Sequence, residues 1–238
     1  MGVFELFDKL GVSLNPPKLI VIYGEAMVGK STLAVMLADR ISQKLQKKPI
    51  IIYVEPVWDD PEYQSFIANV TKAKFEVVKL VDWRQFNSIV AGFRDRVIVL
   101  DSLSALVTDI VSRFTSMGWD VRAIVPRVNQ ITVTLIHFMR LVVNNSKTVG
   151  IIVAHASSSA GVYKHRGAYE DRPAIPRRIL HEVDYELYME IGEDPKTRVI
   201  SVVANRINPF AEGMSATFTF KDGDIEVRES GQLKIRVV

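Results

Sequence analysis

The residues with the clearest chemical purpose form one short stretch, Gly24 to Ser31, with the sequence GEAMVGKS. It fits the pattern GxxxxGK[ST], in which the glycines let backbone N–H groups approach phosphate oxygens. In this pattern Lys30 supplies a charge for the β- and γ-phosphates, and the Ser31 hydroxyl is a ligand for Mg²⁺. The stretch therefore predicts a phosphate loop, and the alternative is a glycine turn that holds no ligand. The residues predicted to contact the nucleotide here are Gly24, Glu25, Ala26, Met27, Val28, Gly29, Lys30, Ser31 and Thr32.

Two carboxylates directly follow predicted strands. Asp101 closes the apolar run VIVLD, where it could hold the water shell of Mg²⁺, or it caps the segment that follows. Glu55 follows IIIYV and is a candidate base for an attacking water, or it is a solvated charge at a strand end. Asp59 competes for the same role, but it has a shorter side chain and is expected to cap the next helix. We therefore predict Lys30, Glu55 and Asp101 as the catalytic residues, with Ser31 and Asp101 at the metal.

Two later strand ends also carry polar side chains. His155 follows IIVA and either senses the γ-phosphate through a hydrogen bond or has a structural role. Arg206, in ANRINP, either lends charge to a nucleotide of its own or a neighbouring chain, or is a surface arginine without function.

Two stretches combine basic and aromatic residues, as surfaces that bind single strands do. Residues 157–178 carry five Lys or Arg against Glu170 and Asp171, a balance of +3 that equals the net charge of the whole chain. The other stretch lies between Asp101 and the next long helix. Either both contact single-stranded DNA or both are solvated loops. The candidate DNA-binding residues are Arg113, Arg122, Tyr163, Lys164, Arg166 and Arg172.

The elements that must position these residues alternate along the chain, as in a parallel α/β sheet. Strands are predicted at 19–23, 50–54, 75–80, 96–100 and 149–154, and helices at 3–10, 31–46, 61–70, 83–93 and 125–144. After a polar loop at 157–176, strands at 183–191, 198–203, 216–220 and 225–227 are expected to add antiparallel strands to the same sheet. The predicted fold is doubly wound, with ligands beyond the carboxyl ends of the parallel strands.

Length and composition favour one large domain. We assign all 238 residues to it, with 1–17 forming a short helix and a linker. The chain has no cysteine, which excludes disulfides and thiolate metal sites. It also has no signal peptide and no apolar run of about 18 residues, so we expect a cytoplasmic protein without a membrane partner. The net charge of +3 permits a polyanionic partner.

The order of the motifs resembles the core of the RecA/RadA recombinases. After the phosphate loop come VIVLDSLSAL, IIVAHA, RPAIPRRILHEVDYELYM and NRINPFAEG. The chain looks most like archaeal RadB and other short RadA paralogues, which lack a helical DNA-binding domain at the N-terminus. The resemblance implies a RecA-like ATPase core that uses ATP and Mg²⁺, with DNA-binding loops at 108–123 and 157–175. It also implies single-stranded DNA and a RadA-type recombinase or another recombination protein as partners.

Departures from the family pattern concern hydrolysis and assembly. Val57 stands at the position of the family's catalytic glutamate, His155 replaces a glutamine, and Ala204 replaces a lysine. The N-terminal FELF lacks the Phe-x-x-Ala motif that builds RadA filaments. We therefore expect a recombination or repair paralogue with weak ATP hydrolysis. The alternatives are a KaiC-like signalling ATPase and a small-molecule kinase, although DSLSAL and the terminal hairpin argue against the kinase.

Overall fold

The computed structural model describes residues 2–157, 172–173 and 177–232. The strands are β1 (Lys18–Gly24), β2 (Pro49–Tyr53), β3 (Glu76–Lys79), β4 (Val97–Asp101), β5 (Val149–Ser157), β6 (Arg172–Pro173), β7 (Tyr185–Ile191), β8 (Thr197–Asn205), β9 (Met214–Lys221) and β10 (Asp224–Gln232). The helices are α1 (Gly2–Lys9), α2 (Lys30–Leu45), α3 (Pro61–Thr71), α4 (Phe86–Gly92), α5 (Leu103–Ser116) and α6 (Val121–Asn145). Short 3₁₀ turns are η1 (Pro56–Asp59), η2 (Trp83–Gln85), η3 (Arg177–His181) and η4 (Pro209–Ala211).

One continuous sheet runs in the order β10-β9-β8-β7-β1-β5-β4-β2-β3, and β6 pairs with β5. The pairs from β7 through β1 to β3 are parallel, whereas β7, β8, β9 and β10 pair antiparallel. The predicted fold class is therefore confirmed. In the register of the sheet, Gly24 lies beside His155 and Tyr53 lies beside Asp101. The polar residues that follow β1, β2, β4 and β5 thus share one edge.

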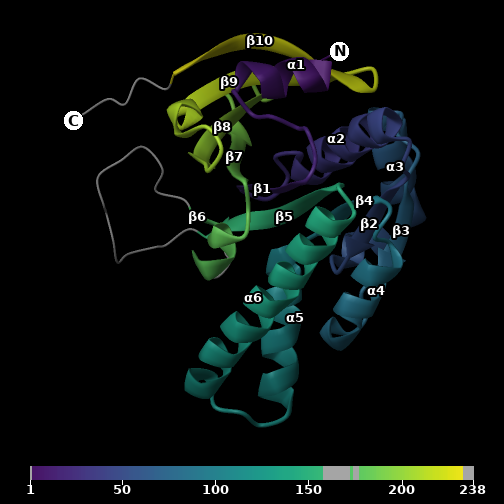
Figure 1. Ribbon diagram of the computed structural model, residues 1–238, viewed down its shortest axis with the longest axis vertical. Coiled ribbons are helices and arrows are strands. Elements are labelled where there is room, and N and C mark those ends of the chain that lie inside the picture. Colours follow the sequence, from purple (N-terminus) through teal and green to yellow (C-terminus); the bar gives the residue numbers. More distant parts are fainter. Residues whose placement is uncertain (1, 158–171, 174–176, 233–238) are drawn as a thin grey trace, which may run out of the picture.

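Alternate residues of the central strands enter two cores, one on each face of the sheet. Ile20 and Ile22 of β1 pack with the buried sides of α1, α2 and α3. Leu19 and Val21 pack on the opposite face with α4, α5 and α6. Both faces are covered, which is why the parallel strands are continuously apolar. Figure 1 shows that α5 and α6 form an antiparallel pair that extends away from the sheet.

Several elements differ from the sequence prediction. The region after Asp101, predicted as a basic stretch before a helix at 125–144, folds into α5 and the start of α6. Ser102 caps α5, because its hydroxyl accepts a hydrogen bond from Ala105 N–H at 3.2 Å. Pro126 lies inside α6, where it costs one backbone hydrogen bond but does not end the helix. The helix predicted at 83–93 begins as the turn η2 before α4. Asp60 rather than Asp59 caps α3, by accepting from Glu62 N–H.

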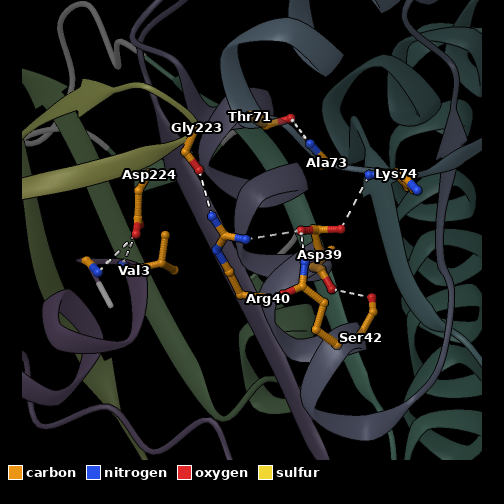
Figure 2. Close-up of polar contacts among 12 residues, drawn as sticks. Val3, Asp39, Arg40, Ser42, Thr71, Ala73, Lys74, Gly223 and Asp224 are labelled. Carbon is orange, nitrogen blue, oxygen red and sulfur yellow. Dashed lines mark hydrogen bonds and ion pairs between the residues drawn. The ribbon is translucent and has the colours of Figure 1, made fainter.

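A polar network ties the C-terminal hairpin to the helices (Figure 2). The Asp224 carboxylate accepts hydrogen bonds from the N–H groups of Gly2 and Val3 in α1, at 3.3 and 3.2 Å. Arg40 of α2 donates to the carbonyl oxygen of Gly223 at 2.8 Å. These contacts hold α1, α2 and the β9–β10 turn together, so the N-terminal helix is part of the folded unit.

Within the ranges that the structure describes, no helix has the length and hydropathy needed to span a bilayer.

Candidate nucleotide-binding site

The phosphate loop joins β1 to α2, and its glycines are required by close packing. A Cβ atom on Gly24 would lie 1.9 Å from the carbonyl oxygen of Met189 in β7. Gly29 has φ +91°, and its Cβ would lie 2.8 Å from the Phe220 ring. Larger residues would push the loop away from β7 and β9. The loop is therefore shaped by the sheet on which it lies as well as by its own sequence.

Two basic side chains hold the loop. Arg198 of β8 donates from Nε to the carbonyl oxygen of Val28 at 2.8 Å, a contact that the sequence pattern did not reveal. The Lys30 ammonium donates to the carbonyl oxygen of Glu25, across the loop. Burial lowers the pKa of Lys30, although the charges of Asp101, Glu55 and Glu25 oppose this effect. Lys30 is thus placed at the mouth of the loop, with only 5% of its surface exposed.

Asp101 lies at the base of the site. Its carboxylate accepts a hydrogen bond from Trp58 Nε1 at 2.7 Å. Burial raises the pKa of Asp101, while hydrogen bonds from Ser31 and Trp58 counteract the rise. Ser31 and Asp101 line the same pocket, and a hydroxyl with a carboxylate is the hard-oxygen donor set that suits Mg²⁺. The alternative role predicted for Asp101, as the cap of the following helix, is filled by Ser102.

Glu55 is held by two neighbours. Its Oε1 accepts a hydrogen bond from the Ser102 hydroxyl at 2.5 Å and lies 3.1 Å from His155 Nε2. The hydrogen bond with His155 is the main cause of a lowered pKa for Glu55, and Ser102 adds to it while burial opposes it. By contrast, Asp59 is exposed, and its carboxylate is bonded to Tyr53 at 2.9 Å and to Lys79. Of the two candidate bases, Glu55 is therefore the one at the site.

These side chains surround a single pocket of about 460 Å³. The predicted residues that line it are Ala26, Met27, Gly29, Lys30, Ser31, Thr32, Glu55, Asp101 and His155. Val57, 44% exposed, also faces this pocket. Tyr63, Phe66 and Ile67 of α3 complete the wall, and no motif in the sequence pointed to them.

Arg206 lies apart from this pocket. It follows β8, which is antiparallel to β7, so the end of β8 is at the edge of the sheet opposite the phosphate loop. There its guanidinium donates to the carbonyl oxygen and to Nδ1 of His181. The hypothesis that Arg206 serves the nucleotide of its own chain does not fit this position. Its alternative, a nucleotide of a neighbouring chain, stays a prediction.

The candidate DNA-binding residues fall in two groups. Arg113 is bonded to Asp109 at 2.7 Å and to the carbonyl oxygen of Val81 at 2.5 Å, and Arg122 is exposed. Both belong to the α5–α6 pair, so residues 108–123 are a helical hairpin and not the loop that the resemblance implied. Arg172 lies in β6 and pairs with residue 157 of β5. The other candidates, Tyr163, Lys164 and Arg166, lie outside the described residues.

Replacing Trp58 with phenylalanine tests the support of Asp101. The smaller ring would leave a cavity and the buried carboxylate would lose its indole donor, so we expect unfolding to become easier by at least about 1–3 kcal/mol. We also expect the Mg²⁺ concentration needed for half-maximal ATP turnover to rise. Urea denaturation and a Mg²⁺ titration measure the two effects, and Trp119→Phe, at an exposed position on the hairpin, is the matched control. Equal stability of the Trp58→Phe and Trp119→Phe proteins would contradict this role.

Comparison with solved structures identifies the fold. Over 94% of this chain and 96% of the other, the protein superposes on the crystal structure of the RadB recombinase with a TM-score of 0.60 at 17% sequence identity. The chain has a RecA-like fold of the RadB type. Among curated proteins it is 24% identical over 230 residues to the DNA repair protein RadA of Halalkalibacterium halodurans. That match covers 95% of this chain but only 43% of the relative, so the chain spans less than half of the relative's length. No protein-family model matches the chain.

The predicted resemblance to the RecA/RadA superfamily, with a RadB-like core, is confirmed by these findings. The predicted archaeal character gains no support from them, because the RadA relative comes from a bacterium. The pocket lies at the carboxyl ends of β1, β2, β4 and β5, where ligands of open α/β sheets bind.

Proposed function

We propose that this protein is a RecA-fold recombinase paralogue that binds ATP, hydrolyses it slowly with Mg²⁺, binds single-stranded DNA and assists homologous recombination or DNA repair. The observation that carries the proposal is the convergence of Lys30, Ser31, Asp101 and Glu55 on one pocket. These are the groups that phosphate binding, metal binding and activation of water require.

Each residue of this set has a defined task. Lys30 would neutralise the β- and γ-phosphates. Ser31 and Asp101 would hold Mg²⁺, and the metal would supply positive charge beside the phosphate oxygens. Glu55 accepts the proton of the attacking water. Glu55 is a poor base for two reasons. It lies two residues before the family's catalytic position, which Val57 occupies, and the hydrogen bonds with His155 and Ser102 lower its pKa. Slow hydrolysis is the expected consequence.

The DNA-binding part of the proposal is supported by the distribution of basic and aromatic residues. Arg113, Arg122 and the segment around Lys164 follow strands whose carboxyl ends face the nucleotide pocket. The proposed protein partner is a RadA-type recombinase or another recombination protein. Support for this class of process comes from relatives described as a DNA repair protein and as a recombinase.

The direct test is the rate of ATP hydrolysis with and without single-stranded DNA, together with DNA binding measured by fluorescence anisotropy. We expect slow turnover that requires Mg²⁺, and measurable DNA binding. ATP turnover without any DNA binding would instead favour a KaiC-like regulator that acts through protein partners. Transfer of phosphate to a small acceptor would favour a kinase.

Replacing Lys164, Arg166 and Arg172 together with alanine should weaken binding of single-stranded DNA. Each lost phosphate contact removes about 0.7 from the slope of log affinity against log salt, so three contacts remove about two. A salt titration of the variant and the parent measures this. The control removes three positive charges elsewhere, at Lys9, Lys79 and Lys196. If the slope is unchanged, these residues do not contact the DNA backbone.

A further inference from the structure

A second pocket, of about 530 Å³, lies at the edge of the sheet opposite the phosphate loop. It is formed where α2 and α3 end and where β2 and β3 begin. Since α2 starts at Lys30 in the phosphate loop, its whole length separates the two pockets. Four lysines surround the second pocket, which we call the lysine pocket: Lys47, Lys48, Lys72 and Lys74.

The acidic residues of the lysine pocket are already engaged with other groups. Asp39 accepts hydrogen bonds from Gln43 Nε2 at 2.6 Å and from Lys74 N–H at 3.3 Å, and it lies 3.6 Å from Arg40. Glu76 forms an ion pair with Arg96. The two carboxylates are therefore compensated by arginines and amides, and they leave the lysine ammonium groups as surplus positive charge.

Within residues 2–157, 172–173 and 177–232, the four lysines form no ion pair of their own. Lys47 donates to a neutral acceptor, the carbonyl oxygen of Ser146, at 2.8 Å. Lys48 acts electrostatically on Glu76, which Arg96 already pairs. For Lys48, Lys72 and Lys74, the described part of the chain contains no ion pair. Four positive charges around one concave site attract anions to it.

The backbone holds two of these lysines in defined positions. Lys72 follows α3 with φ 53°, and its Cγ lies close enough to Gly223 that a Cβ there would come within 2.3 Å. Lys74 is fixed through its own N–H to Asp39, and Ala73 N–H donates to the Thr71 hydroxyl at 3.2 Å (Figure 2). These contacts therefore hold the backbone from which the Lys72 and Lys74 side chains extend.

Stabilisation of helix C-termini explains the positions of only two of the four lysines. Lys72 directly follows α3 and Lys47 lies two residues after α2, close to helix ends where a positive charge complements the dipole. Lys48 and Lys74 lie further on, each close to the start of the next strand, beyond the reach of that effect. The pocket wall also contains the Phe75 ring and the amides of Gln43 and Gln46.

We propose that the lysine pocket binds the sugar–phosphate backbone of single-stranded nucleic acid, as a site separate from the nucleotide pocket and from the α5–α6 hairpin. Ammonium groups neutralise phosphates. The half-buried Phe75 ring beside them packs edge-to-face against Trp58, with ring centroids 6.0 Å apart, so the lysines rather than this ring carry the proposal. Four lysines around one pocket match several consecutive phosphates of a strand rather than one isolated anion. Because the pocket is at the opposite edge of the sheet, the proposal does not require ATP binding.

Chemical footprinting of lysines tests the proposal directly. The protein is acetylated with a lysine-reactive ester, with and without an oligothymidylate of about 20 nucleotides, and modification is read by mass spectrometry. We expect the oligonucleotide to protect Lys48, Lys72 and Lys74, while the half-buried Lys9 and the exposed Lys79 and Lys196, which lie outside the pocket, keep the reactivity they have without it. Full reactivity of the first three lysines at saturating oligonucleotide would overturn the proposal.

A pair of charge-matched variants gives the second readout. The triple change of Lys48, Lys72 and Lys74 to glutamine should weaken binding of the same oligonucleotide and reduce the salt slope by about two. The triple change of Lys9, Lys79 and Lys196 to glutamine removes the same charge and should leave the slope close to that of the parent. Equal slopes for the two variants would overturn the proposal, and circular dichroism checks that both are folded.

The two proposals fail in different ways. If DNA binds but the lysine pocket is not protected, the further inference is wrong and the proposed function stands. If the lysines are protected but ATP is neither bound nor hydrolysed, the lysine pocket stands and the ATPase proposal is wrong.

Discussion

Lys30→Ala should lower ATP binding and turnover by about 10²–10³-fold, the loss expected when one preorganised charge is removed from a phosphoryl-transfer site. Among the described residues that line the nucleotide pocket, Lys30 is the only lysine or arginine. No neighbouring cation in that set can compensate for it. The Lys30 side chain also reaches across the loop and donates to the Glu25 carbonyl oxygen. Its removal would leave the phosphates without a cation at the mouth of the site.

Isothermal titration calorimetry with ATP and Mg²⁺ measures this loss, and circular dichroism checks the fold. Lys18→Ala is the matched control. Lys18 begins the same strand at its far end and donates to the Pro17 carbonyl oxygen at 3.0 Å, outside the pocket. We expect the Lys18→Ala protein to bind ATP like the parent. A Lys30→Ala protein that binds and hydrolyses ATP like the parent would refute the central assignment.

Glu55→Gln should lower single-turnover hydrolysis by about 10²-fold or more, in the range of a lost general base. The amide keeps the shape and can still bond to Ser102 and His155, but it cannot take a proton from water. Asp59→Asn is the control, because Asp59 is bonded to Tyr53 and Lys79 away from the pocket. If Asp59→Asn stops hydrolysis while Glu55→Gln has no effect, the base is misassigned.

If Glu55 is the base, the rate of hydrolysis should depend on pH in a defined direction. A base works only when deprotonated, and the hydrogen bond with His155 lowers the pKa of Glu55 below its ordinary value of 4.5. Activity should therefore persist as the pH falls and be lost only below that ordinary value.

Val57→Glu, which places a carboxylate at a second position on the pocket wall, should raise the rate of ATP hydrolysis. A faster Val57→Glu protein would mean that the base of the parent is misplaced. An unchanged rate would mean that the site is deficient in another respect.

The local parts of the site were predictable from the sequence because they depend on neighbouring residues. The phosphate loop needs its glycines, lysine and serine in one short run, and the apolar runs before Gly24, Glu55 and Asp101 identify buried parallel strands. Since parallel strands end at a common edge, their order predicted that these residues converge. The sheet order and register confirm that convergence.

Tertiary structure alone decided which side chains hold the site and which leave it. Trp58 supports Asp101 across 43 positions of the chain, and Arg198 supports Val28 across 170, separations that no motif records. The antiparallel turn from β7 to β8 carries Arg206 to the far edge of the sheet, whereas the sequence left open whether it contacts a nucleotide or is a surface arginine. The lysine pocket likewise joins the ends of two helices that are distant in sequence. Sequence patterns report the periodicity and turns of single elements, whereas such contacts depend on how separate elements pack.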